Sequence, residues 1–448
     1  MSDQPGTEDR PPATTRHDPY HAFRFRTYRH YLFGSLLVSM GTAAQSIAIG
    51  WEMYDRTGRA MSLAWVGLLQ ALPMLLLTLP SGVLADRFDR RRIMMIGLTG
   101  TGLTSVGLAL LSASQGSIAW MYFLLLLDAS FNRVAWPARA AMLPMLVPRD
   151  AFENAVKWRT SGFQISATVG PAIGGFIIAW WLPAAYWMSA GSEALFMVLL
   201  ARLAIPRLAP RDPGALRGLA GVVHDLTEGL GFVWRNRLLL GTISLDLFAV
   251  LLGGAVYLLP IYAMDILEVG ERGLGWLRAA PAAGALVTAL LLAHLPPMRR
   301  AGLTLLLSVA GFGVATIVFG LSTSFWLSMS MLFLTGVFDN VSVVVRQTLV
   351  QLATPDAMRG RVSSVNAVFI GSSNEIGGFE SGLVAQYFGP VLSVVSGGIG
   401  TLLVVGLWSA LFPRLRQLRQ LTDAGDEPEP PRGFEVLPAT PDTERTTG

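Results

Sequence analysis

Residues 82–92 read GVLADRFDRRR and join two long apolar segments, residues 62–84 and 92–113. Each segment is long enough to cross a bilayer as a helix, because a helix needs roughly 20 apolar residues to span the hydrocarbon core. The stretch between them is short and crowded with charge, so it has to lie in water or among lipid headgroups. The unit predicts a hairpin of two membrane-spanning helices with a charged loop on one face of the membrane.

The same alternation of apolar segment and polar loop continues along the whole chain. The sequence has 448 residues, of which 52% are hydrophobic and 14% are charged, whereas soluble domains carry about 25% charged residues. The apolar segments lie at 31–54, 62–84, 92–113, 118–146, 160–182, 184–205, 238–263, 274–295, 302–321, 325–352, 362–387 and 391–412. Their length favours helices over the strands of a membrane barrel, which are about ten residues long. We therefore predict an all-α membrane protein with 12 transmembrane helices.

The basic residues predict how these helices are oriented. With the N-terminus in the cytoplasm, the inner loops carry 23 arginine and lysine residues, and the outer loops carry only Arg56, Arg59 and Arg272. Cytoplasmic loops of membrane proteins are enriched in such residues. We therefore expect both termini in the cytoplasm and a location in the cell (inner) membrane.

The longest inner loop divides the chain into two halves. We expect a disordered tail over 1–25, a six-helix bundle over 26–205, a cytoplasmic linker over 206–237, a second six-helix bundle over 238–415 and a disordered tail over 416–448. The linker mixes apolar residues with His224, Asp225 and Glu228. It is therefore either an amphipathic helix on the inner leaflet or a simple connection.

An internal repeat relates the two halves. A shift of 207 residues places Arg139 on Arg346 and Asn132 on Asp339, and it also matches Gly170 with Gly377 and Gly175 with Gly382. A shift of 208 residues places Gly67 on Gly275 and Pro73 on Pro281. Parallel repeats of this kind form the two pseudo-symmetric halves of alternating-access transporters. The repeat therefore favours a transporter.

The loop at residues 82–92 resembles the signature loop of the major facilitator superfamily. The match rests on Gly82, Leu84, Asp86, Arg87, Arg90 and Arg91. A glycine permits close helix packing, and a carboxylate beside arginines can cap a helix or form ion pairs. The resemblance implies two pseudo-symmetric six-helix bundles and a latch at this loop that holds the outward-facing state. The alternative is that the arginines only set the orientation.

Three further stretches resemble the same superfamily. Residues 170–175 read GPAIGG and are similar to a motif of its antiporters, in which Gly170, Pro171, Gly174 and Gly175 kink and pack the helix. Tight packing without an antiport role is the alternative. Arg133 resembles an arginine of the fourth span that is linked to proton coupling. Residues 346–349, 354–362 and 228–238 resemble the branch of enterobactin and macrolide exporters.

Charged residues inside apolar segments are costly unless they are paired or wetted, so each is a functional candidate. The candidates for proton coupling or for the cavity wall are Asp128, Asn132, Arg133, Asp246, Asp339, Asn340, Arg346, Glu375 and Glu380. A carboxylate in a partly dehydrated pocket can bind and release a proton near neutral pH. The structural alternative is pairing, of Arg133 with Asp128 or Asp339, or of Arg278 with Glu375.

The resemblance also implies where these residues lie. Spans 1, 4, 7 and 10 line the cavity of the superfamily fold, which would bring Asn132, Arg133, Asp246, Asp339 and Asn340 to one aqueous pocket. Glu375 and Glu380 lie about 140° apart around a helix, so they cannot both face that pocket. The candidates for substrate contacts are Gln45, Gln70, Trp136 and Gln164, because a pocket with aromatic and polar groups suits a bulky amphipathic molecule.

These features predict a proton-coupled exporter, an antiporter of a small or medium organic molecule such as a siderophore or a drug. We expect it to work as a monomer in the lipid bilayer. The alternatives are an uncoupled facilitator, a lysophospholipid flippase and a non-transporting sensor on the same fold.

Other classes of protein do not match the sequence. The chain has no cysteine, and its five histidines do not cluster with acids, so we expect no metal site, no cofactor and no enzymatic activity. A P-loop for ATP is missing from the sequence. The basic residues lie in short loops between apolar segments, which is the pattern of membrane orientation, so nucleic acid is not an expected partner.

Overall fold

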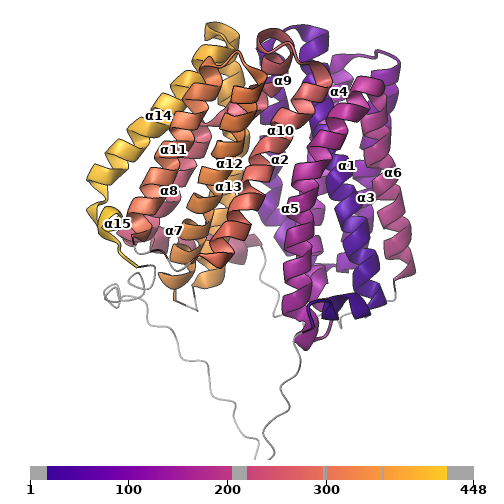
Figure 1. The fold of residues 1–448 in the computed structure, drawn as a ribbon. Helices are drawn as coiled ribbons and strands as arrows, with labels where there is room; N and C mark the ends of the chain where they lie inside the picture. The colour runs from indigo at the N-terminus through magenta and orange to yellow at the C-terminus, as the bar shows by residue number, and fades with distance from the viewer. Residues whose placement is uncertain (1–17, 204–218, 296–297, 299, 356–357, 421–448) are drawn as a thin grey trace, which may run out of the picture.

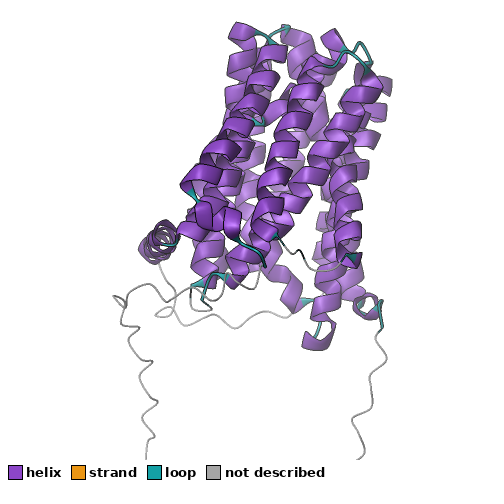
Figure 2. Cartoon of the chain, turned by 60° about the vertical axis from the view of Figure 1, so that its left-hand side comes forward, coloured by secondary structure: helices purple, strands orange, loops and turns teal. Residues whose placement is uncertain are grey.

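The computed structural model describes residues 18–203, 219–295, 298, 300–355 and 358–420. This part of the chain is helical, and Figure 2 shows helices and loops but no strand in it. The long helices run side by side between two ends of the molecule (Figure 1). We call one of them the basic end, because it holds the start of α1 together with Arg90, Arg149, Arg237 and Arg359 at the starts of other helices. The opposite end is called the far end.

The first half of the chain forms six long helices, as predicted. They are α1 (Arg26–Thr57), α2 (Ala60–Arg87), α3 (Arg90–Ala113), α4 (Ile118–Met142), α5 (Arg149–Trp180) and α6 (Pro183–Arg202). Helix α5 begins eleven residues before the predicted span at 160, because polar residues at the basic end continue the helix beyond its apolar segment. One turn of 3-10 helix, η2 (Leu143–Met145), follows α4.

The second half has the same number of crossings, but its first one is broken. The predicted helix over 238–263 is divided into α8 (Arg237–Leu252), a 3-10 turn η4 (Gly254–Leu258), α9 (Leu259–Ile261) and a π-helical turn η5 (Tyr262–Ile266). The break falls at Gly253 and Gly254, where a Cβ on Gly254 would lie 2.7 Å from the Gly377 carbonyl oxygen. The two glycines therefore let another helix approach at the point where the backbone ladder is interrupted.

Five long helices complete the second half. They are α10 (Gly270–His294), α11 (Ala301–Leu321), α12 (Phe325–Leu352), α13 (Arg359–Phe388) and α14 (Pro390–Leu411), followed by the short α15 (Pro413–Gln417). By length and composition, eleven segments of the described chain are apolar enough to cross a membrane. Helix α13 is more polar and is not among these eleven, but it packs against α2, α8 and α14 and completes the second set of six, as the twelfth predicted crossing.

The two halves repeat one arrangement of six helices. In the first half α1 packs against α5 and α6, α3 packs against α4 and α6, and α2 packs against α4. In the second half α8 packs against α13 and α14, α11 against α12 and α14, and α10 against α12. These contacts correspond one to one when α1 to α6 are matched with α8 and α10 to α14. The predicted internal repeat is therefore present as two pseudo-symmetric bundles.

The described part of the linker is a helix, α7 (Leu219–Arg235). Arg361 at the start of α13 binds it through Asp225 at 3.0 Å and Glu228 at 2.9 Å. On another face, Leu230 and Trp234 are exposed. Its predicted place on the inner leaflet remains a prediction, and residues 206–218 of the expected linker lie outside the described residues.

The expected tails are shorter than predicted. Residues 18–25 belong to the predicted N-terminal tail, yet they pack on α5, and His21–Arg24 form a 3-10 turn, η1. The reason is a set of aromatic contacts, since Tyr20 and Phe23 both pack against Trp158. At the other terminus, described residues continue to 420, and the rest of both predicted tails lies outside the described residues.

Candidate functional site

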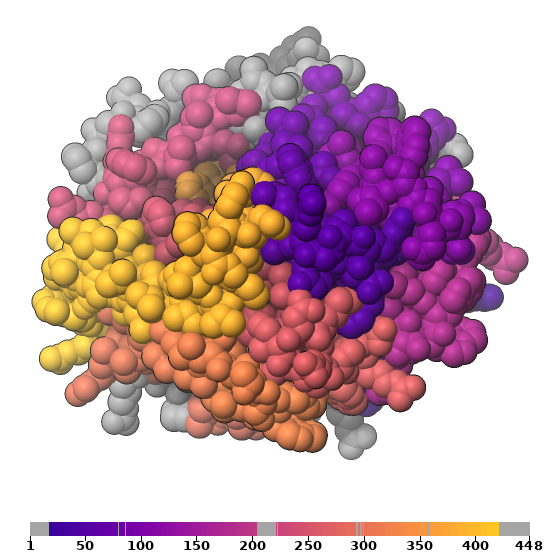
Figure 3. All heavy atoms as spheres, turned by 90° about the horizontal axis from the view of Figure 1, so that it is seen from above, coloured from indigo at the N-terminus to yellow at the C-terminus, as the bar shows by residue number. Residues whose placement is uncertain are grey.

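The two bundles meet along two helix pairs, α2 with α13 and α5 with α10. At the far end the Tyr54 hydroxyl donates to Asp265, and the Met61 amide donates to the side chain of Gln386 at 2.9 Å. Near mid-depth the Gln164 side-chain amide donates to the Ala282 carbonyl at 3.3 Å. Figure 3, which looks onto the far end, shows atoms of the two halves in contact across the middle of this face. The described state is therefore closed at the far end.

The GPAIGG segment supplies close packing on two sides of α5. A Cβ on Gly174 would lie 2.8 Å from the Ala44 Cα of α1, and a Cβ on Gly170 would lie 2.9 Å from the Ala43 Cβ. On the other side, a Cβ on Gly175 would lie 2.6 Å from the Gly275 Cα of α10. Any side chain there would push the helices apart. These glycines therefore form both the bundle core and the contact between bundles, and the antiport role of the motif remains a prediction.

The crossing of α2 with α13 is built in the same way. A Cβ on Gly67 would lie 2.9 Å from the Phe379 amide nitrogen, and a Cβ on Gly382 would lie 2.7 Å from the Ala64 amide nitrogen. Gly67 and Gly382 are the repeat partners of Gly275 and Gly175. The two contacts between the bundles are therefore equivalent by pseudo-symmetry.

Glu375 lies on α13 at this crossing. Its backbone carbonyl oxygen is 3.2 Å from the position that a Cβ on Gly67 would take. The Tyr257 hydroxyl donates a hydrogen bond of 2.9 Å to its carboxylate. Arg278 of α10 lies close by and donates to the Val256 carbonyl at 3.2 Å. Tyr257 was not among the predicted residues; the adjacent glycines at 253 and 254, inside an apolar span, were the available signal for a broken helix.

Arg133 approaches the same carboxylate from the other bundle. The guanidinium groups of Arg133 on α4 and Arg278 on α10 both attract Glu375 electrostatically. The predicted alternative of Arg278 near Glu375 is therefore found in part, with Tyr257 making the direct contact. With its carboxylate charged, this group of Arg133, Arg278 and Glu375 has a net charge of +1. We call these three residues and Tyr257 the Glu375 cluster.

Two polar residues of α12 remain without partners in the described part of the chain. Asp339 forms no hydrogen bond or ion pair with any described residue, and the Asn340 Oδ1 is buried and unsatisfied. Asn132, the repeat partner of Asp339, is half-buried on α4. Unpaired buried groups are rare in folded proteins, so these residues stay candidates for substrate or proton binding.

Asp246 does not lie in the pocket predicted for it together with Arg133, because it pairs with Arg346, another of the candidates. Both side chains are buried, at 8% and 3% exposure, and they form an ion pair between α8 and α12 inside the second bundle. Each charge offsets the other, as a buried ion requires a close partner, although the Arg346 Nε and Nη1 have no hydrogen-bond partner among the described residues. The pair therefore stabilises the bundle.

Asp128 likewise faces away from the Glu375 cluster. It accepts a hydrogen bond of 2.9 Å from Thr104 of α3 and contacts Gln45 of α1, so it lies inside the first bundle. Gln45 is 3% exposed there and is not placed for a substrate contact. The predicted pairing of Arg133 with Asp128 is not found among the ion pairs of the described residues.

The remaining candidates are dispersed. The Glu380 carboxylate accepts a hydrogen bond of 3.4 Å from the hydroxyl of the neighbouring Ser381. Gln164 is taken up by its contact with α10, Gln70 is half-buried on α2, and Trp136 is 54% exposed. A carboxylate outside the candidates, Glu52, is fully satisfied by the Tyr186 hydroxyl at 2.8 Å and by Arg56 at 3.3 Å.

The latch expected at residues 82–92 stays a prediction, because the described residues do not include the side chain of Asp86. A Cβ on Gly82 would meet nothing within 4 Å, so the expected close approach is absent here. Arg87 is exposed, while Arg90 and Arg91 donate to the carbonyls of Ala141 at 3.1 Å and Ala201 at 2.6 Å, at the ends of α4 and α6. Cations stabilise such helix ends.

The helix cap of this loop comes from a residue that was not predicted. Asp89 caps α3 by accepting hydrogen bonds from the amides of Arg91 at 2.8 Å and Arg92 at 3.2 Å. It directly precedes the first helical residue, which is the usual place of a capping aspartate. The side chain of Asp86 lies outside the described residues.

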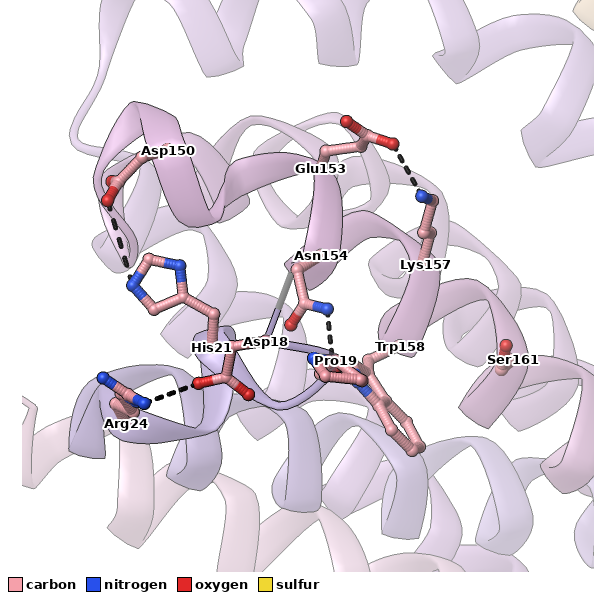
Figure 4. Close-up of a pocket in the computed structure, with 10 residues that line it drawn as sticks. All are labelled: Asp18, Pro19, His21, Arg24, Asp150, Glu153, Asn154, Lys157, Trp158 and Ser161. Carbon is pink, nitrogen blue, oxygen red and sulfur yellow. Dashed lines mark hydrogen bonds and ion pairs between the residues drawn. The ribbon is translucent and has the colours of Figure 1, made fainter. Parts of the chain in front are cut away.

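A cavity of about 630 Å³ lies at the basic end, at the periphery of the first bundle. Figure 4 shows that it is formed where the N-terminal segment crosses the start of α5. Asn154 and Trp158 both donate to the Pro19 carbonyl, at 2.7 and 2.8 Å. Ion pairs surround this contact, including Arg24 with Asp18 at 2.7 Å. The cavity therefore marks the anchor of the N-terminal segment at the start of α5, away from the contact of Gly175 with α10 near the other end of that helix.

Two pseudo-symmetric six-helix bundles with charged residues at their contact give this chain the fold of the major facilitator superfamily, and the family comparison places it there. The particular family follows from comparison with known sequences. A model of the transmembrane secretion effector family matches residues 17–436, and the chain belongs to this family.

The known relatives are transporters. The chain is 28% identical over 340 residues to the enterobactin exporter EntS of Shigella boydii serotype 18, covering 76% of this chain and 80% of that protein. The same values hold for the enterobactin exporter EntS of Shigella flexneri. The protein is accordingly a multi-pass membrane transporter of a small molecule and is not an enzyme.

Solved structures agree with the fold. One is a bacterial homologue of the human lysosomal transporter Spinster in an inward-facing and occupied conformation, with a TM-score of 0.68, 14% identity and coverage of 89% of this chain and 99% of that chain. A POT family transporter in complex with 5-aminolevulinic acid has a TM-score of 0.66 and 12% identity, and covers 87% of this chain and 97% of that chain.

Proposed function

We propose that this protein is a proton-coupled exporter that moves an organic molecule of small or medium size out of the cytoplasm by alternating access. The observation that carries the proposal is the position of Glu375 at the contact of the two bundles. Arg133 attracts its carboxylate from the first bundle, and Tyr257 and Arg278 surround it from the second. Because the partners of Glu375 belong to both bundles, its protonation depends on the distance between the bundles.

The cycle follows from these partners. In the state closed at the far end, the Tyr257 hydroxyl donates to the Glu375 carboxylate, and the guanidinium groups of Arg133 and Arg278 attract it. When the bundles separate at the far end, Arg133 moves away with the first bundle, and Glu375 can take up a proton from outside. Closing the far end brings Arg133 back and favours release of the proton to the cytoplasm. Each cycle would thus import a proton while the substrate leaves, as in an antiporter.

The charge of the cluster supports a substrate class. With Glu375 ionised, the Glu375 cluster itself has a net charge of +1, which favours molecules with acidic or phenolate groups. Among the relatives are exporters of enterobactin. We therefore propose a siderophore or a similarly acidic amphipathic compound, ahead of a cationic drug. Asp339, Asn340 and Asn132 are the proposed additional polar contacts, because Asp339 and the Asn340 oxygen lack partners among the described residues.

The proposal also covers orientation and gating. The excess of basic residues in the loops at the basic end supports cytoplasmic termini in the inner membrane. Because Gly82 has open space around it in the state closed at the far end, we propose that the 82–92 loop packs as a latch when the basic end closes. We also propose that the monomer is the working unit, since one chain holds both bundles.

Transport by the purified protein in liposomes tests the proposal. Wild-type protein should move a catecholate siderophore against its gradient when a pH gradient is imposed. Glu375→Gln should lose this response and keep exchange of substrate for substrate. Glu52→Gln, a buried carboxylate outside the cluster, is the matched control and should respond as the wild type does. Wild-type flux that ignores the pH gradient would identify an uncoupled facilitator or flippase, and binding without flux would identify a sensor.

A further inference from the structure

Helix α7 presents an apolar face to the outside of the described molecule. Val223, Leu230 and Trp234 are 43%, 40% and 70% exposed. Together with the exposed Thr227 they recur every three or four residues, so the four side chains form one line along the helix. A shallow groove of about 330 Å³ follows this line from Thr227 to Arg235. We call the four residues the exposed stripe.

The opposite side of α7 packs on the second bundle. Asp225 lies nine residues before Trp234, which places the two side chains about 180° apart around the helix. The carboxylates of Asp225 and Glu228 accept hydrogen bonds from Arg361 at 3.0 and 2.9 Å, and Val233 is buried in a cluster with residues of α8 and α13. Both acidic side chains of α7 are therefore paired with α13, and neither belongs to the exposed stripe.

The exposed stripe ends where the chain begins its next crossing of the membrane. Helix α7 lies next to α8 at the basic end (Figure 1), and only two residues separate Trp234 from Arg237, the first residue of α8. One of the two, Asn236, caps α8 by accepting hydrogen bonds of 3.0 Å from the amides of Leu238 and Leu239. So short a connection keeps Trp234 near the membrane–water interface, where tryptophan is enriched in membrane proteins.

The sequence around the exposed stripe is basic. Apart from the paired acids of α7, residues 204–237 contain one acid, Asp212, and five arginines, which are Arg207, Arg211, Arg217, Arg235 and Arg237. Each arginine near an anionic bilayer strengthens binding about fivefold. A helix with an apolar face and flanking basic residues binds in the plane of such a surface. Charge and depth in the membrane therefore both favour lipid over a cytoplasmic protein as the occupant of the stripe.

We propose that α7 docks its exposed stripe on the membrane leaflet at the basic end and binds anionic phospholipid headgroups through the arginines that flank it. The helix contacts α2 of the first bundle as well as α8 and α13 of the second. A lipid-bound α7 therefore touches both bundles at once, and the composition of this leaflet acts on the contact between them. The docking does not depend on the proton coupling proposed for Glu375.

Spin labels on the full-length protein test the docking, since the chain has no cysteine of its own. Val223→Cys, Leu230→Cys and Trp234→Cys place the label on the stripe, and Lys157→Cys places it on an exposed residue of α5. In nanodiscs of phosphatidylethanolamine and phosphatidylglycerol, molecular oxygen should relax the stripe labels more strongly than a water-soluble nickel chelate does. The label at position 157 should show the reverse order. Stripe labels that nickel reaches more readily, or that neither reagent reaches, would overturn the docking, because water or protein then covers the stripe.

Wild-type protein tests the lipid chemistry without any substitution. The amide hydrogens of residues 219–235 should exchange at least fivefold more slowly in nanodiscs that contain phosphatidylglycerol than in nanodiscs of phosphatidylcholine alone. The start of α5, residues 149–157, is the internal control and should exchange equally in both. Equal rates over residues 219–235 in the two bilayers would refute the binding of anionic headgroups. Glu375→Gln should leave these rates unchanged, so this proposal and the proton coupling can fail separately.

Discussion

The hydroxyl of Tyr257, which lies in the break of the first crossing of the second bundle, donates a hydrogen bond of 2.9 Å to the carboxylate of Glu375 on α13. Tyr257 belongs to a short 3-10 turn, and its ring packs so closely on α13 that a Cβ on Gly378 would lie 2.8 Å from it. The 3-10 turn therefore positions the Tyr257 hydroxyl against the Glu375 carboxylate, which is surrounded by residues of both bundles.

Replacing this donor should change the pH dependence of transport. Tyr257→Phe keeps the ring packing and removes the hydrogen bond to the charged form, which contributes about 1.5–3 kcal/mol. Proton release should then need a more alkaline cytoplasmic side, and the pH of half-maximal exchange should rise by roughly one to two units. Liposome flux at a series of internal pH values measures this. Tyr262→Phe, which loses a bond to the Gly320 carbonyl, is the control; equal shifts in both variants would refute the role.

A side chain at the crossing of α5 and α10 should open the far end. Gly175→Ala places a methyl group 2.6 Å from the Gly275 Cα, and overpacking of this kind costs about 1–3 kcal/mol. The closed state should lose roughly tenfold in population relative to the opposite state. The chain has no cysteine, so spin labels at Arg59→Cys and Tyr387→Cys can report the distance. Gly191→Ala, with open space around it, should leave the distribution unchanged.

The ion pair of Asp246 with Arg346 should behave as a structural element. Arg346→Met alone leaves a buried carboxylate unpaired and should lower stability by about 3–5 kcal/mol. The double variant Asp246→Leu with Arg346→Met should regain most of that stability, because both charges are removed together. Thermal unfolding of the four proteins of this cycle gives the coupling energy. Should the double variant be stable and yet lose its response to a pH gradient, the pair would take part in coupling after all.

The contact of α7 with α13 should depend on one arginine. Arg361→Ala removes the ion pairs with Asp225 and Glu228, whose side chains are 25% and 19% exposed. Partly exposed pairs contribute up to about 1 kcal/mol each, so α7 should open more often and exchange its amide hydrogens roughly tenfold faster. Hydrogen exchange over residues 219–235 measures this. Removal of Lys157, which pairs with an exposed Glu153 at 2.6 Å, should leave that segment unaffected.

The sequence was sufficient for the fold. Run length alone gave the number of crossings, because the bilayer fixes how long an apolar helix must be. The 207-residue repeat anticipated the matching of Gly175 with Gly382, and the structure places both at crossings between the bundles. The sequence analysis did not predict the break at Gly253, because the hydropathy of a segment contains no information on where a neighbouring helix packs against it.

The site was harder to predict than the fold. Hydropathy identifies which charges are buried, but the partner of each depends on how the helices rotate about their axes. Asp246 was expected in the same pocket as Arg133, and it instead faces Arg346 within its own bundle. Tyr257 could not be distinguished from other aromatic residues of the membrane segments, since its role depends on the turn that carries it.

The two glycine crossings have an evolutionary consequence. Gly67 presses on α13 next to Gly378, and its repeat partner Gly275 presses on α5 at Pro171, the repeat partner of Gly378. Each surface thus meets a copy of the other, which is the relation found in a dimer with twofold symmetry. An ancestor with six helices would have formed a dimer through these two surfaces. Gene duplication and fusion would then have kept both crossings between the bundles intact.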